Sequence, residues 1–204
     1  MNSEIDIYNF LPKYPNIENI GDEYYMNPYK KSFNQAIYEK KEFEKFKGGN
    51  FKVGITWSGS GHYAGKKNSK RDIHPEEIAK LIRCFDEANI EFHSLQIEES
   101  KNNSLRALVT KQFFSHEKFL MDFSDTAALL SQMDLVVSID TATAHLAGAL
   151  NIPTLLLIPD PPDFMALTDR VDSPWYPSIS IVRQIERDKW PIELVAEKIS
   201  KFMQ

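Results

Sequence analysis

Cysteine is almost absent from this chain of 204 residues, in which Cys84 is the only one. A single cysteine excludes an internal disulfide bond and a zinc site built from cysteines. We expect Cys84 to be a small buried residue of a helix rather than a nucleophile. Stability must then come from an apolar core, for which a chain of this length is long enough.

Long apolar runs and an excess of positive charge are missing too. No stretch approaches the roughly 20 apolar residues that cross a bilayer, and the amino terminus lacks the pattern of a signal peptide. The 24 lysines and arginines are outnumbered by 29 aspartates and glutamates, and the net charge of −5 argues against nonspecific binding to nucleic acid. We therefore expect a cytoplasmic protein with no membrane span and no nucleic-acid partner.

Two ligand-binding signatures are also missing. No Gly-x-Gly-x-x-Gly segment opens a helix after the first predicted strand, which argues against a dinucleotide-dependent oxidoreductase. The chain has no Asp-x-Asp signature, and His62, His74, His93 and His116 lack the spacing of metal ligands. We expect neither a metal centre nor a resident cofactor.

From residue 51 onward the sequence alternates short apolar runs with amphipathic stretches. Strands are predicted at residues 51–57, 90–95, 119–123, 135–139, 152–158 and 179–183, and helices at 75–89, 103–111, from 125, 144–150 and 191–202. This alternation implies right-handed crossovers and a parallel sheet covered by helices on both faces. We predict a Rossmann-like, doubly wound α/β domain over residues 50–204.

Residues 1–49 have a different character. Pro12, Pro15 and Pro28, with scattered aromatic residues, indicate an extended segment. Apolar residues between 30 and 47 recur at helical spacing. We predict a helical or irregular amino-terminal arm over residues 1–49.

The most informative segment runs from residue 122 to 153, and its centre is a continuously apolar strand at 135–139. Asp140, Thr141 and Ala142 follow at the end of that strand, and a helix of small residues begins directly after them. In parallel α/β sheets ligands lie outside the carboxyl ends of the strands, where a helix amino terminus suits phosphate. His145 could add a hydrogen bond or a positive charge. The segment predicts a phosphate site.

Each of these residues also has a structural explanation. Asp140 or Thr141 could simply cap the following helix, and His145 could be a packed core histidine. Gln96 could hydrogen-bond a strand end, and Arg71 could belong to a solvated basic loop. The residues alone leave these alternatives open.

Several segments carry a resemblance to a known family. They are Val53-Gly-Ile-Thr-Trp-Ser-Gly59, Ser94-Leu-Gln96, Asp122-Phe-Ser-Asp-Thr-Ala-Ala128, Asp134-Leu-Val-Val-Ser-Ile-Asp-Thr-Ala-Thr-Ala-His-Leu-Ala-Gly-Ala-Leu150, Asp172-Ser-Pro-Trp-Tyr-Pro177, Arg183-Gln184 and Trp190. In content and order they resemble the carboxyl-terminal domain of GT-B glycosyltransferases of the heptosyltransferase class, family 9. The version often fused behind tetratricopeptide repeats in bacteria is the most similar.

The resemblance implies a domain that binds a nucleotide-diphosphate sugar donor for transfer to a glycan, lipid or protein acceptor. It implies a shared set of donor- and phosphate-binding positions, which in this chain are Ser58, Gly59, Ser60, Arg71, Gln96, Asp140, Thr141, Ala142 and His145. The catalytic base is expected in the other half of such an enzyme.

Two features depart from the family. The phosphate turn often has glycine where this chain has Ala142, and the loop at 163–167 lacks the arginine and tryptophan of the repeat-associated relatives. A GT-B enzyme has two facing domains, and residues before 51 offer no room for the second. Two functions stay open. One is a donor domain that is active with an acceptor-binding domain or a repeat-containing partner, and the other is a non-catalytic nucleotide-sugar binding module.

Overall fold

The computed structural model describes residues 49–59, 71–109, 112–160, 170–186 and 189–204. The predicted arm with its helix, Ser60 and the loop at 163–167 lie outside the described residues. In the described part no helix is long and apolar enough to cross a membrane.

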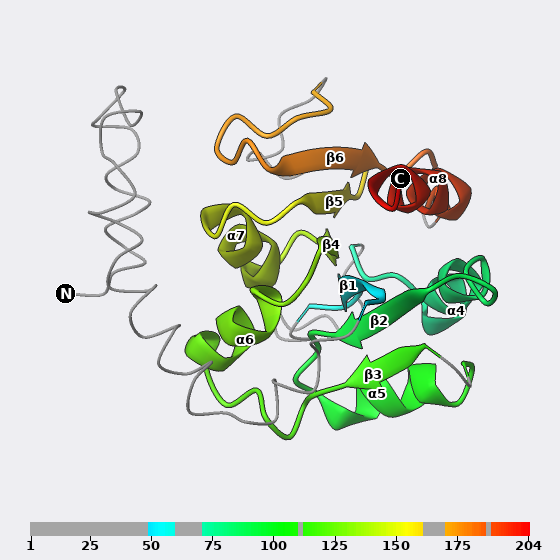
Figure 1. Cartoon of the computed structure of the whole chain (residues 1–204). Coiled ribbons are helices and arrows are strands. Elements are labelled where there is room, and N and C mark those ends of the chain that lie inside the picture. The colour runs from blue at the N-terminus through cyan, green and yellow to red at the C-terminus, as the bar shows by residue number, and fades with distance from the viewer. Residues whose placement is uncertain (1–48, 60–70, 110–111, 161–169, 187–188) are drawn as a thin grey trace.

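Six parallel strands form one sheet in the order β3-β2-β1-β4-β5-β6 (Figure 1). Their bounds are β1 Phe51–Thr56, β2 Ile90–Ser94, β3 Phe113–Ser115, β4 Leu135–Ile139, β5 Thr154–Ile158 and β6 Ile179–Arg183. This is the strand order of doubly wound nucleotide-binding folds, in which the chain direction across the sheet reverses between β1 and β4. The predicted Rossmann-like fold is confirmed.

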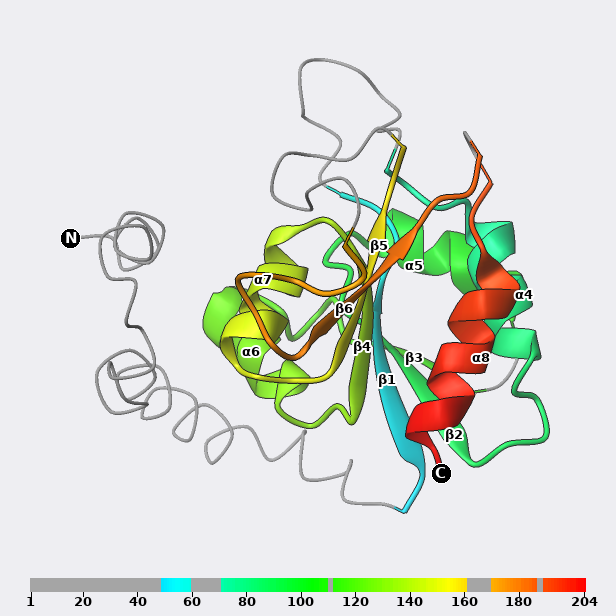
Figure 2. The same ribbon diagram turned by 90° about the horizontal axis from the view of Figure 1, so that it is seen from above.

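Helices cover both faces of the sheet, α6 and α7 on one and α4, α5 and α8 on the other (Figure 2). Their bounds are α4 Pro75–Arg83, α5 Glu99–Arg106, α6 Phe123–Leu130, α7 Ala142–Ala149 and α8 Ile192–Phe202. The central strands are buried on both faces, as their continuously apolar sequences require. Val53 and Ile55 of β1 belong to the core beneath α4 and α8. Gly54 and Thr56 alternate with them and face α6 and α7.

The strand predicted at 119–123 is wrong. The third strand is β3, a short edge strand at Phe113–Ser115, and residues 117–119 form a turn. Leu120 packs inward, whereas Phe119, Met121 and Phe123 are exposed, because this apolar run borders a cleft instead of joining the sheet.

Two helix boundaries and one burial prediction also differ. The helix predicted at 103–111 is α5, which starts at Glu99. The prediction missed this start because the first residues of α5 are polar and show no apolar periodicity. The helix predicted at 75–89 ends at Arg83, and turns lead to β2. Cys84 follows the end of α4 and is exposed, so its predicted burial is wrong.

Candidate functional site

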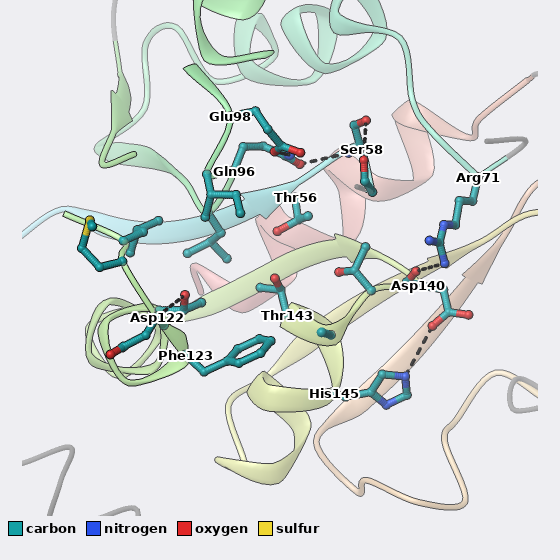
Figure 3. A pocket seen from close by; sticks show the side chains of 18 residues that line it. Thr56, Ser58, Arg71, Gln96, Glu98, Asp122, Phe123, Asp140, Thr143 and His145 are labelled. Atoms are coloured by element: carbon teal, nitrogen blue, oxygen red, sulfur yellow. Dashed lines mark hydrogen bonds and ion pairs between the residues drawn. The ribbon is translucent and has the colours of Figure 1, made fainter. Parts of the chain in front are cut away.

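A cleft of about 550 Å³ opens at the carboxyl ends of β1, β2 and β4, within the size range of small-molecule sites (Figure 3). The amino termini of α6 and α7 complete its wall. The lining residues are Thr56, Ser58, Gly59, Arg71, Leu95, Gln96, Ile97, Glu98, Leu120, Met121, Asp122, Phe123, Thr126, Asp140, Thr141, Ala142, Thr143 and His145. Eight of the nine site residues predicted from the sequence line this one cleft, and the ninth, Ser60, lies outside the described residues.

The two helix termini at the cleft differ in how their backbone amides are used. At α6 the Asp122 carboxylate accepts a hydrogen bond from the Asp125 amide at 3.0 Å, and the Asp125 carboxylate accepts one from the Met121 amide at 2.8 Å. At α7 the N-cap residue is Thr141, whose side chain makes no capping hydrogen bond. The amino terminus of α6 is therefore closed by its own carboxylates, and that of α7 is open toward the cleft.

Asp140 is not the helix cap that the sequence allowed, because it precedes the N-cap. Its carboxylate lies 3.5 Å from Nε2 of His145, one turn into α7. The ring of His145 is also held by Tyr176, with 5.8 Å between the ring centroids. Both side chains of the pair are half-buried at the edge of the cleft, with the imidazole positioned by a carboxylate and an aromatic ring.

Arg71 reaches across the cleft from the segment before α4. Its Nη1 donates a hydrogen bond to the backbone carbonyl of Asp140 at 2.8 Å, which holds the guanidinium next to the start of α7. Gly59 provides the space for this arrangement, because a Cβ there would lie 3.0 Å from Nη2 of Arg71. The position of Arg71 is that of a cleft residue and not that of a solvated loop residue.

Gln96 joins the loops that follow β1 and β2. The amide oxygen accepts hydrogen bonds from the backbone amides of Trp57 at 3.1 Å and Ser58 at 3.0 Å, and the amide nitrogen donates to Glu98 at 3.3 Å. Only 3% of Gln96 is exposed. Of the two interpretations that the sequence left open, this geometry matches the structural one, in which Gln96 fixes the cleft wall.

The sequence prediction missed the apolar side of the cleft. Ile97, Met121 and Phe123, which we call the apolar rim, are 59%, 80% and 52% exposed. Large apolar side chains with so much exposure beside a polar cleft indicate a contact surface for an apolar or aromatic group. The segment from Asp122 to Ala128 was recognised as part of a family pattern, but nothing in that pattern assigned the segment to the wall of the site.

The charges of the cleft leave a place for an anion. Each carboxylate has a counterpart: Glu98 pairs with Lys101 at 2.8 Å, Asp140 lies by His145, and Asp122 caps α6. The open terminus of α7 and the Arg71 guanidinium lie next to each other, beside Asp140, and both favour a diphosphate or similar anion. Within the described ranges no three histidine, cysteine or acidic side chains are grouped as metal ligands.

Comparison with known families identifies the family of this chain. The sequence model of glycosyltransferase family 9 (heptosyltransferase) matches residues 75–194, which is more than half of the chain. The chain belongs to glycosyltransferase family 9. The matched region of this family 9 domain contains every described element from α4 to the start of α8, and Arg71, Ser58 and Gly59 lie just before it. A comparison with curated proteins gave no significant match.

Solved structures show the same fold. The E. coli heptosyltransferase WaaC with ADP matches with a TM-score of 0.55 and 17% identity, over 74% of this chain and 44% of WaaC. E. coli ADP-heptose LPS heptosyltransferase II matches with a TM-score of 0.58 and 13% identity, over 84% of this chain and 51% of that protein. A family 9 glycosyl transferase from Veillonella parvula matches with a TM-score of 0.54 and 12% identity, over 85% of this chain and 43% of that protein. The chain thus spans about half the length of the structures it matches.

Proposed function

We propose that this family 9 domain binds the nucleotide-diphosphate sugar donor of a glycosyl transfer reaction. The observation that carries the proposal is the open amino terminus of α7 beside the Arg71 guanidinium, at the carboxyl ends of β1 and β4. Helix amides and a guanidinium fork together suit the oxygens of a diphosphate. Further support comes from WaaC, whose structures contain ADP and ADP-2-deoxy-2-fluoro heptose.

The rest of the cleft accommodates the other parts of such a donor. The nucleobase would pack on the apolar rim, where aromatic and thioether side chains offer flat or adaptable contact. Glu98, held by Lys101, would accept hydrogen bonds from the ribose hydroxyls. The sugar would extend toward Asp140 and His145 at the far edge.

The proposed reaction requires one main contribution from this domain, which is stabilisation of the leaving diphosphate. In glycosyl transfer the bond between the anomeric carbon and a diphosphate oxygen breaks, and the electron pair stays on the diphosphate as negative charge. On this proposal that charge develops beside Arg71 and the α7 amides, which would stabilise the transition state with little reorganisation. The acceptor, and the base that takes its proton, would come from an acceptor-binding half in the same parent chain or in a partner.

Titration calorimetry with ADP, UDP and GDP on the wild type and on Arg71→Met tests the proposal. Loss of hydrogen bonds to a charged ligand weakens binding by roughly ten- to a hundred-fold, so we expect that loss for the nucleotide that binds best. Arg170→Met is the matched control, because Arg170 is an exposed arginine outside the cleft that pairs with Asp172 at 2.6 Å. Absence of saturable binding by the wild type, or equal losses in both variants, would contradict the proposal.

A further inference from the structure

The floor of the cleft contains one polar group whose hydrogen-bonding capacity is unused. Thr56 is the last residue of β1, 5% exposed, and its side chain faces the cleft side of the sheet. Among the described residues, its Oγ1 has no hydrogen-bond partner. A buried hydroxyl without a partner is costly, and a strand position between apolar neighbours would accept valine at no such cost.

Two hydroxyls near Thr56 are engaged with each other or with the backbone. Ser138, the register partner of Thr56 on β4, donates to the carbonyl of Ile139 at 2.7 Å and lies 3.2 Å from Oγ1 of Thr141. Thr141 is the N-cap residue of α7. Thr56 therefore lies one strand away from the open helix terminus, and Figure 3 shows it on the cleft floor between Gln96 and Thr143.

We propose that Thr56 is a ligand-contact residue whose hydroxyl donates a hydrogen bond to a phosphate oxygen of the bound nucleoside diphosphate. This inference rests on the proposed function and adds a contact on β1 to those from α7 and Arg71. The Oγ1 atom is shielded from solvent in the unliganded protein. A rotation of about 120° about χ1 moves the hydroxyl to the position held by the methyl group, and this rotation breaks no hydrogen bond because none is made.

The proposal makes stability and binding respond in opposite ways. Thr56→Val keeps the shape of the side chain and removes the hydroxyl. Because no protein partner is lost, the urea midpoint of Thr56→Val should stay at the wild-type value or rise. Its affinity for inorganic pyrophosphate and for ADP, UDP or GDP should fall by roughly ten- to a hundred-fold, the range for a hydrogen bond to a charged group. Thr56→Ser should retain most of the affinity.

Thr154→Val is the matched control. Thr154 is a buried threonine at the amino-terminal end of β5, away from the cleft at the carboxyl ends of the strands. Its Oγ1 donates to the carbonyl of Ile152 at 2.9 Å. This variant should lose stability and bind the probes as the wild type does. Equal pyrophosphate and nucleotide affinities in Thr56→Val and wild type would overturn the Thr56 contact alone, and so would a loss of stability as large as that of the control. Failure of the wild type to bind any probe would overturn both this contact and the proposed function.

Discussion

Replacing Gln96 with methionine tests the claim that this residue fixes the cleft wall. Methionine has a similar length and no oxygen, so the amides of Trp57 and Ser58 lose their acceptor. Trp57 is fully buried, and an unsatisfied buried donor costs about 1–3 kcal/mol. The Ser58 amide is half-buried and recovers part of its loss by hydration, which adds about 1 kcal/mol. We expect the free energy of unfolding to fall by about 2–4 kcal/mol.

Urea denaturation measures this loss directly. With a slope of about 2 kcal/mol per molar urea, the midpoint should fall by about 1–2 M at an unchanged slope. Gln132→Met makes the same chemical change at a surface glutamine, whose amide donates a long 3.4 Å hydrogen bond to Ser131. That control should stay within about 0.5 kcal/mol of the wild type. A Gln96→Met midpoint equal to that of the control would refute the assigned role of Gln96.

Two further predictions concern the rest of the domain. Burial lowers the pKa of His93 and of His116 to about 4 from an ordinary 6.5, so the unfolded chain binds more protons than the folded one between these values. Stability should therefore fall as the pH drops from about 6.5 to 4, by at most about 2.7 kcal/mol per pH unit for two protons, and His116→Gln should flatten the fall in urea midpoint. Gly148→Ala would place a Cβ 2.6 Å from Cγ of Tyr176, whereas at Gly49 a Cβ meets nothing within 4 Å. We expect Gly148→Ala to lose about 1–3 kcal/mol in urea denaturation and Gly49→Ala to be neutral, and equal midpoints would contradict this packing.

Strands that are buried on both faces were predictable, because β1, β4 and β5 are short apolar runs between polar turns. Edge strand β3 was not, because it has three residues and a stronger apolar run follows it at 119–123. That run is apolar because it borders the cleft. Apolar pattern alone does not separate a residue of the sheet from an exposed residue that lines a cleft.

The position of the site was predictable for a similar reason. Residues that directly follow parallel strands meet at one edge of the sheet, so Ser58, Asp140 and Thr141 had to lie close together. The use of each side chain was not predictable. Whether Gln96 contacts a ligand or a backbone amide depends on the loop of another strand, which lies far away in the sequence. That the Thr56 hydroxyl has no hydrogen-bond partner likewise depends on the hydrogen bonds that its neighbours on the adjacent strand make.

The most direct test of the central claim is a two-dimensional amide NMR titration of the chain with ADP, UDP and GDP. If the open terminus of α7 holds the diphosphate, the amides of Ala142 and Thr143 should shift most strongly, with smaller shifts at Ser58 and Gly59. The corresponding nucleosides should leave the α7 amides unchanged. Saturable shifts that spare the α7 amides, or no shifts with any of the three nucleotides, would contradict a donor site in this cleft.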